Sequence, residues 1–111
     1  MEEKNINVSL YGEEDNYEYK GVATIHKDII KFSDKEDTYI LDNSLERLTK
    51  FSKEKTIAID FKNGSIKVTI DSKEINIPIK VDKIMNESNK KEYIYSTEDT
   101  KEKRLVIEIE V

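Results

Sequence analysis

The chain contains few of the side chains that usually perform chemistry in proteins. It has one histidine, His26, and no cysteine, which removes disulfides, thiolate nucleophiles and zinc–thiolate sites together. A general base or a metal-ligating histidine needs a second group beside it. The alternation of the sequence instead places His26 outward at a strand end, next to Lys27 and Asp28. We therefore expect a solvated turn histidine, no metal site and no cofactor.

The carboxylates and hydroxyls form no recognisable catalytic or cation site. Glu13, Glu14 and Asp15 are consecutive, whereas a calcium loop spaces its oxygens at alternate positions and adds a glycine and a distant bidentate glutamate. Such a charge run is typical of a solvated hairpin loop. The sequence also has no G-x-S-x-G elbow, phosphate-binding glycine loop or H-E-x-x-H motif. We predict that the protein is not an enzyme.

Tyrosines are the remaining candidates for ligand contact. The segments YEY and YIY each place two phenols on one face of a strand. The rings could line the mouth of a pocket, because each combines apolar area with a hydrogen-bonding tip, or they could cover the ends of the core. Under the first interpretation the ligand-binding residues are Tyr17, Tyr19, Tyr93 and Tyr95 at the mouth, with Phe51 and Phe61 deeper.

Composition indicates one domain over residues 1–111 with a thin core, since 36% of the residues are hydrophobic and 39% are charged. The net charge of −5 is spread over interspersed acids and bases, so no nucleic-acid surface is expected. No apolar run approaches the roughly 18 residues of a membrane helix, and the first residues do not resemble a signal peptide. We expect a cytoplasmic protein without membrane insertion. The Ile, Asn, Lys and Glu content resembles that of AT-rich bacterial genomes.

The strongest structural signal is the alternation of apolar and polar residues from Thr56 to Val81, which is typical of half-buried strands. Asn63 and Gly64 predict a type I′ hairpin turn, and a second turn is expected at Ser72 and Lys73. These turns predict three strands with one apolar face, paired as Phe61–Ile66, Ile59–Val68, Ile57–Ile70, Ile70–Ile75, Val68–Ile77 and Ile66–Ile79. Pro78 cannot donate to a ladder, so we expect a local break in pairing there.

Similar alternation predicts further strands near residues 6–11, 17–26, 29–33, 38–41, 80–85, 92–97 and 104–111. Residues 43–48 resemble a capping box followed by helical spacing, which indicates at most one short helical turn that runs into a strand. About eight short antiparallel strands leave sheet edges that closure into a barrel would remove. The predicted fold is therefore an all-β antiparallel meander that closes into a small barrel, with a β-sandwich as the alternative.

At GSIKVTIDSKEINIPI, residues 64–79, the sequence resembles the YwiB-like family of uncharacterised bacterial proteins. KFSKEKTIAIDF is similar to the preceding strand of that family, and RLVIEIEV resembles the closing one, so the resemblance covers the C-terminal two thirds of the chain. The chain departs from the pattern before the glycine, where it has only Lys62 and Asn63 in place of an aromatic and proline-containing segment. The resemblance implies a calycin-like (lipocalin-like) barrel and no catalytic residues.

Two functions remain open. Bulky inward residues leave little room in a small barrel, which favours a non-catalytic interaction or scaffold module that binds a protein partner. The alternative is a lipocalin-like binder of a small apolar ligand in the barrel mouth. For the first function, the charged turns are expected to gather at one end as a crown, with Lys53, Lys55, Lys101 and Lys103 as partner-binding residues.

Overall fold

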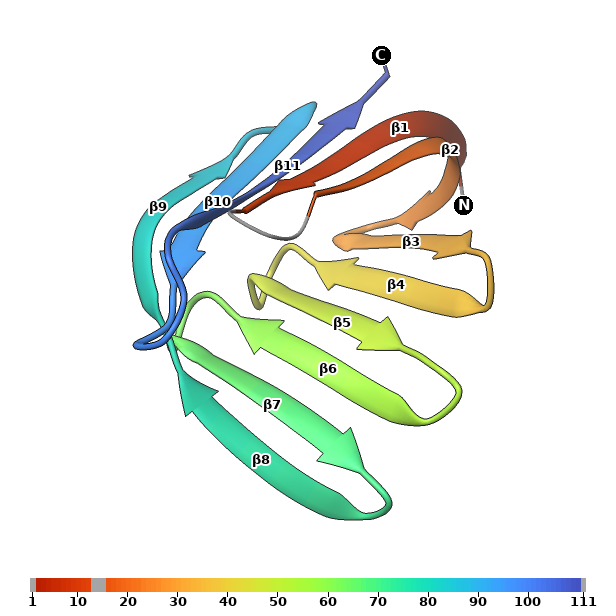
Figure 1. The fold of residues 1–111 in the computed structure, drawn as a ribbon. Coiled ribbons are helices and arrows are strands. Elements are labelled where there is room, and N and C mark those ends of the chain that lie inside the picture. The colour runs from red at the N-terminus through yellow and green to blue at the C-terminus, as the bar shows by residue number, and fades with distance from the viewer. Residues whose placement is uncertain (1, 13–15, 111) are drawn as a thin grey trace.

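The computed structural model describes residues 2–12 and 16–110, so the acidic cluster at positions 13–15 lies outside the described part. Within that part, eleven antiparallel strands form one sheet (Figure 1). The strands are β1 (Glu2–Tyr11), β2 (Tyr17–His26), β3 (Ile29–Asp34), β4 (Asp37–Asp42), β5 (Arg47–Phe51), β6 (Lys55–Asp60), β7 (Ser65–Ile70), β8 (Lys73–Pro78), β9 (Lys80–Asn86), β10 (Lys90–Ser96) and β11 (Lys103–Ile109).

The all-β antiparallel meander is confirmed, but the sheet has more strands than the eight or so that the sequence predicts. β5 illustrates why alternation undercounts the strands, since the sequence predicts a strand there only as the continuation of a helical turn. Its inward positions hold Leu48 and the charged Lys50, while the apolar Phe51 occupies the alternate, outward position opposite Thr38 and Thr56. Because this pattern does not separate an apolar face from a polar one, alternation does not reveal the strand.

The two edges of the sheet are β8 and β9, which are consecutive in the sequence. Only Ile79 separates them, and the chain runs through Pro78 and Ile79 as one bent segment (Figure 1). The first half of this segment pairs with β7 and the second half with β10. Since β8 and β9 do not pair with each other, the barrel is nearly closed, and pairing changes partner at the proline as expected.

A second opening lies between β2 and β3. These strands pair only from Thr24 to His26, and the segment from Tyr17 to Val22 continues beside β1 alone. The strands β9, β10, β11, β1 and β2 therefore turn away from β3–β8 and cross above them in the view of Figure 1. Side chains, rather than backbone hydrogen bonds, join the two halves along this opening.

The hairpin between β6 and β7 has a different register from the predicted one. Ile59 pairs with Ile66, and Asp60 pairs with Ser65, because residues 61–64 form a four-residue turn. A type I′ turn would need positive φ at both Asn63 and Gly64, but only Gly64 has it, at 73°. The shift is an even number of residues, so the apolar side chains still face inward.

The hairpin between β7 and β8 also differs from the prediction. Its type I′ turn lies at Asp71 and Ser72, whose φ angles are 50° and 65°. This turn pairs Ile70 with Lys73 instead of Ile75. Val68 and Ile66 then pair with Ile75 and Ile77.

The carboxylate of Asp60 determines the β6–β7 turn. It accepts hydrogen bonds from the backbone N–H of Asn63 at 2.9 Å and from Asn63 Nδ2 at 2.9 Å, and it lies 3.4 Å from Arg47 NH2. Burial would raise the pKa of Asp60, but the hydrogen bonds from Asn63 and Arg47 outweigh it, so the pKa is lowered. Asp60 therefore stabilises the fold in its ionised form.

Replacement of Asp60 by alanine is expected to lower the free energy of unfolding by about 2 kcal/mol at pH 7, because it removes a buried acceptor from charged and backbone donors. The folded-state pKa is depressed, so this contribution is present above the unfolded-state value and is lost as pH falls through the folded-state pKa. Urea unfolding at several pH values measures both effects. Asp82→Ala, at an exposed ion pair with Lys80, is the control and should cost under about 0.5 kcal/mol.

Residues 43–46 form a turn, and the predicted helical turn is absent. Asp42, rather than Asn43, caps it: Asp42 Oδ1 accepts hydrogen bonds from the Ser44 N–H, the Ser44 hydroxyl and the Leu45 N–H. Glu46 ends the turn with a φ of 51°, a left-handed conformation that stops a helix from continuing. β5 begins at the next residue.

Inward residues of both halves form one hydrophobic core. The core residues are Ile6, Val8, Ala23, Ile30, Phe32, Leu41, Leu48, Phe61, Tyr93, Tyr95, Leu105, Ile107 and Ile109. Cross-strand pairing aligns Leu41, Leu48, Ile59 and Ile66 in a row across β4, β5, β6 and β7. No helix that could span a membrane is found in residues 2–12 and 16–110.

Candidate functional site

Four aromatic side chains, which we call the aromatic seam, bridge the opening between β2 and β3: Tyr17, Tyr19, Phe32 and Tyr39. The ring of Tyr19 stacks on Phe32 with centroids 4.9 Å apart, and Phe32 stacks on Tyr39 at 4.8 Å. Tyr17 stacks on the same Tyr39 at 5.9 Å. A Cβ at Gly21 would lie 2.4 Å from the Tyr19 hydroxyl oxygen, so glycine leaves the space that this ring occupies. The rings take the place of the missing strand pairing.

Charged groups surround the end of the aromatic seam. The Tyr17 hydroxyl donates to Asp34 Oδ2 at 2.6 Å, and burial together with this bond raises the pKa of Tyr17. Lys50 Nζ lies 3.6 Å from Asp37 Oδ2 and 5.8 Å from the centroid of the Tyr39 ring. Both carboxylates therefore already have partners within the protein. Phe32 and Lys50 were not singled out from the sequence, although the predicted pairing of 29–33 with 38–41 would have brought the rings of Phe32 and Tyr39 together.

The other predicted ligand residues form a buried cluster. Phe61 stacks on Tyr93 with ring centroids 4.1 Å apart and meets Tyr95 edge-on at 5.4 Å. Tyr93 is 0% exposed, and Phe61 and Tyr95 are nearly as deeply buried. The structure thus brings these three rings together, but they fill the interior instead of lining a mouth. Phe51 is separate from them, since it is 43% exposed on the outer face of β5.

The four candidate lysines do not form one crown. Lys53 and Lys55 lie at the β5–β6 turn, on the right of Figure 1, together with the β3–β4 and β7–β8 turns. The β10–β11 loop that carries Lys101 lies on the opposite side of the molecule, and Lys103 begins β11 there. In a simple meander the β5–β6 turn and the β10–β11 loop would lie at the same end of the barrel. Because the two halves of this barrel cross, the turn and the loop lie far apart.

Inward-facing apolar residues extend beyond the core on β6, β7 and β8, and we call this region the open face. Its first row is Ile57, Val68 and Ile75, which are directly opposite one another on the three strands. Its second row is Lys55, Ile70 and Lys73. Ile75 is 54% exposed and Ile70 is 40% exposed, although strand alternation points them to the same side as the core-packed Ile59 and Ile66.

The open face adjoins the free edge of β8. In a two-residue hairpin the residues flanking the turn exchange both backbone hydrogen bonds, so Lys73, Ile75 and Ile77 direct their N–H and C=O groups to β7. The Ile79 N–H continues this series by donating to the Gly64 carbonyl at 3.0 Å. The backbone groups of Glu74 and Asn76 therefore point away from the sheet, without a strand to pair with. The backbone nitrogen of Pro78 also points away from β7, so its lack of an amide hydrogen removes no hydrogen bond between β7 and β8.

The interior also holds a lysine. Lys91 on β10 is 4% exposed, and its ammonium donates to the Glu87 carbonyl oxygen. Burial lowers the pKa of Lys91, against the opposing charge of Glu87. The hydroxyl of Tyr93, two residues along the same strand, is buried without a hydrogen-bond partner among the described residues. Phe61 covers the Tyr93 ring, so these groups bear on stability rather than on binding.

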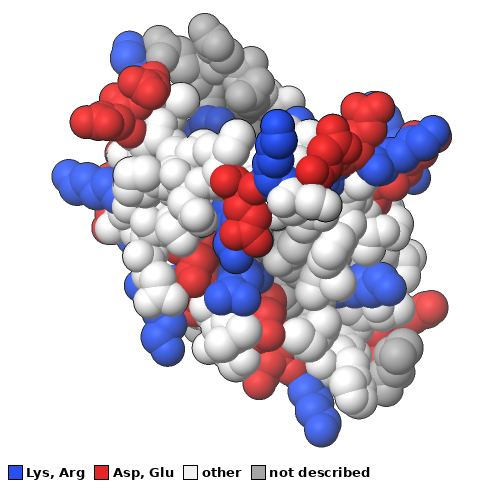
Figure 2. Space-filling view, turned by 90° about the horizontal axis from the view of Figure 1, so that it is seen from below, with Lys and Arg blue, Asp and Glu red and all other residues white. Residues whose placement is uncertain are grey.

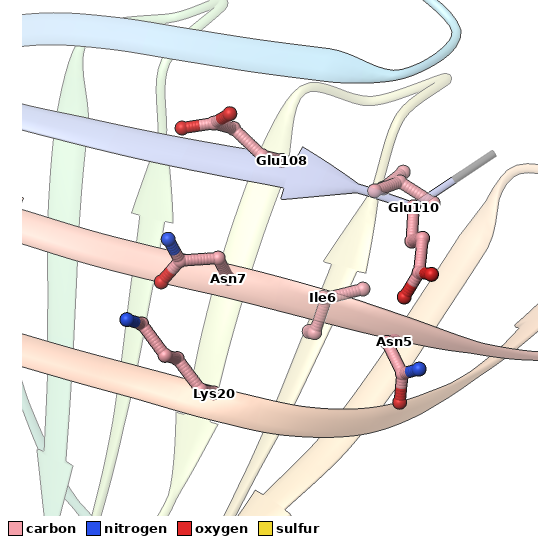
Figure 3. A pocket seen from close by; sticks show the side chains of 7 residues that line it. Asn5, Ile6, Asn7, Lys20, Glu108 and Glu110 are labelled. Atoms are coloured by element: carbon pink, nitrogen blue, oxygen red, sulfur yellow. The ribbon is translucent and has the colours of Figure 1, made fainter.

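The outer surface of the described residues carries a shallow depression and charges of mixed sign. A depression of about 330 Å³ lies over β1, β2 and β11, where Asn7 stands between Lys20 and Glu108 (Figure 3). Acidic and basic residues alternate over the face in Figure 2, without a region of single sign. Among the described residues no group of histidines and carboxylates could hold a metal ion. His26 is exposed at the end of β2.

No protein-family model, curated protein or solved structure matches this chain. The resemblance to the YwiB-like family therefore stays a prediction. The open face and the free edge of β8 are the features of the molecule that suggest a function.

Proposed function

We propose that the protein is a non-catalytic interaction module, which docks a protein partner on the open face and along β8. The observation that carries the proposal is the exposure of Ile75. An inward apolar residue on an edge strand is normally covered by the next strand or by the opposite layer. Here neither covers it, and the adjoining backbone groups of Glu74 and Asn76 are unpaired as well.

The packing of the interior supports an interaction module over a carrier of small apolar ligands. The buried rings of Phe61, Tyr93 and Tyr95 fill the interior, where Phe61 contacts both tyrosines. The aromatic seam is likewise stacked ring on ring. A ligand in the barrel would have to displace these contacts, whereas a partner on the open face would add contacts to residues that are now exposed.

Site-specific photo-crosslinking in the cell of origin tests the proposal. A photoreactive benzoyl-phenylalanine would replace Ile75 in one variant and Val22 in a second. Val22 is the matched control, because it is 52% exposed against 54% for Ile75 and lies on the outer face of β2. We expect a covalent adduct with another protein from the Ile75 variant and none from the Val22 variant.

Equal adducts from both variants, or an adduct from Val22 alone, would overturn the proposal. If the Ile75 variant forms no adduct and native mass spectrometry shows that the protein retains a small molecule, the carrier of small apolar ligands would be favoured instead. An adduct at Ile75 with twice the mass of the chain would place a second copy on the open face.

A further inference from the structure

We infer that the partner segment is an extended strand, which pairs antiparallel with β8 and places an acidic side chain beside Lys73. This inference rests on the proposed docking function and specifies the chemistry of the partner. It depends on two independent features of the same edge: the unpaired backbone groups of β8 and the charges of the second row of the open face.

The backbone of β8 favours a strand over a helix or a small molecule. Glu74 and Asn76 each direct one N–H and one C=O away from β7. An antiparallel strand with residues opposite Glu74 and Asn76 would satisfy all four groups and would leave Pro78 outside the ladder. The residue opposite Ile75 would then be in the closer, non-hydrogen-bonded position, where side chains of neighbouring strands make the most contact.

The side chains of the open face favour an acidic partner. Lys55 and Lys73 lie on the same face two strands apart, which corresponds to about 10 Å at the usual strand spacing. Ile70 lies between them, so no carboxylate separates the two ammonium groups within the row. Among the described residues, the ion pairs of this end join Lys50 with Asp37 and Lys67 with Glu74, and neither involves Lys55 or Lys73. A carboxylate on the added strand would lie beside Lys73, and Lys55 would contribute a second positive charge farther along the same row.

A second copy of the chain is a poorer occupant. Antiparallel pairing of β8 with its own copy about Ile75 would place Ile77 of the copy opposite Lys73 and the copy's Lys73 opposite Ile77, so no carboxylate would lie beside Lys73. Each copy would also bring a net charge of −5. The acidic-apolar strand, in which an acidic residue and isoleucine or valine alternate with polar residues, fits both the apolar row and the lysine row.

A designed peptide tests the inference directly. The blocked, fluorophore-labelled heptapeptide Thr-Val-Thr-Ile-Thr-Glu-Thr would place its isoleucine opposite Ile75 and its glutamate opposite Lys73 in the antiparallel register. A matched peptide has lysine in place of glutamate. A third peptide is N-methylated at its third and fifth residues, whose amides would face β8. Fluorescence anisotropy measures the affinity of each for the intact protein and for Lys73→Glu.

We expect the glutamate peptide to bind the intact protein at least about fivefold more tightly than the lysine peptide, given the size of cross-strand charge effects. Lys73→Glu should reverse this preference, and both preferences should weaken with added salt. The N-methylated peptide should not bind. A circular dichroism spectrum confirms that the Lys73→Glu variant is folded.

The outcomes separate the inference from the proposed function. Equal binding of the glutamate and lysine peptides, or an unchanged preference in Lys73→Glu, would overturn the acidic partner. Full binding of the N-methylated peptide would overturn strand addition, and so would failure of all three peptides at millimolar concentration. The crosslinking comparison of Ile75 with Val22 uses no peptide, so it would still decide whether the open face docks a protein.

Discussion

Phe61→Ala is expected to lower the free energy of unfolding by about 3–5 kcal/mol, a large part of the stability of a small domain. Phe61 is 2% exposed and contributes to both aromatic contacts of the buried cluster. Alanine would lose the burial of the ring, the contact energy with Tyr93 and Tyr95, and the volume that the ring fills between the two halves of the barrel. Urea unfolding followed by circular dichroism measures the change.

Two other variants control for this result. Phe61→Leu retains apolar volume but removes the aromatic stacking, so we expect an intermediate cost of about 1–2 kcal/mol. Phe51→Ala makes the same substitution at a ring on the outer face, and we expect it to cost under about 1 kcal/mol. A similar loss of stability in Phe51→Ala and Phe61→Ala would contradict the location of the core at Phe61.

The protein is expected to lose stability steeply above pH 10, because buried tyrosines resist ionisation. Burial raises the pKa of Tyr93 to about 12 and that of Tyr95 to about 12. Between the ordinary value of 10 and these values the unfolded chain releases the protons while the folded chain keeps them, so stability falls as pH rises. Each residue should cost about 1.4 kcal/mol by pH 11.

Tyr93→Phe and Tyr95→Phe separate the two contributions. Each variant should lose about half of the alkaline sensitivity due to this pair, measured as the free energy of unfolding at pH 8, 9, 10 and 11. Tyr93→Phe should also be more stable than the parent protein at pH 7, by about 1 kcal/mol, because it removes a buried hydroxyl without a hydrogen-bond partner. An unchanged alkaline loss in the double variant would show that these tyrosines are not buried in solution.

The lowered pKa of Lys91 acts in the opposite direction. The unfolded chain holds the lysine proton to higher pH than the folded chain does, so this residue alone would make stability rise with pH above its folded-state pKa. The raised pKa of Tyr17 adds to the effect of the other two tyrosines. Three tyrosines therefore oppose one lysine, and a net loss of stability is expected above pH 10.

Period-two alternation in the sequence predicts which side chains face inward, and it does so reliably from Thr56 to Val81. A shift of two residues leaves every side chain on the same face, so the faces are correct even though the register is not. The register depends on which residues form the turn. At Asp60 a side-chain carboxylate binds the amide of Asn63, which the alternation of the strands does not reveal.

The open face is not predictable from the pattern either. Ile59 and Ile75 are equivalent by alternation, yet Ile59 packs on the core whereas more than half of Ile75 is exposed. The difference arises from the crossing of the two halves. The crossing covers β6–β8 at the end with the β6–β7 turn and leaves the end with the β7–β8 turn uncovered (Figure 1). That crossing depends on where β2 separates from β3 and where the chain bends at Pro78. The alternation of apolar and polar residues does not indicate where β2 separates from β3 or where the chain bends.

The order of the sheet also sets the order in which the protein can be completed during translation. Every strand pair except β1–β11 joins neighbours in the sequence, so each hairpin can form as soon as its second strand leaves the ribosome. β1 differs, because one of its two partners is the last of these eleven strands to be made. Until β11 emerges, the edge of β1 from Ile6 to Tyr11 has no strand to pair with, although the other ten strands have been made. The N-terminal strand is therefore the part that a chaperone would need to shield for the longest time.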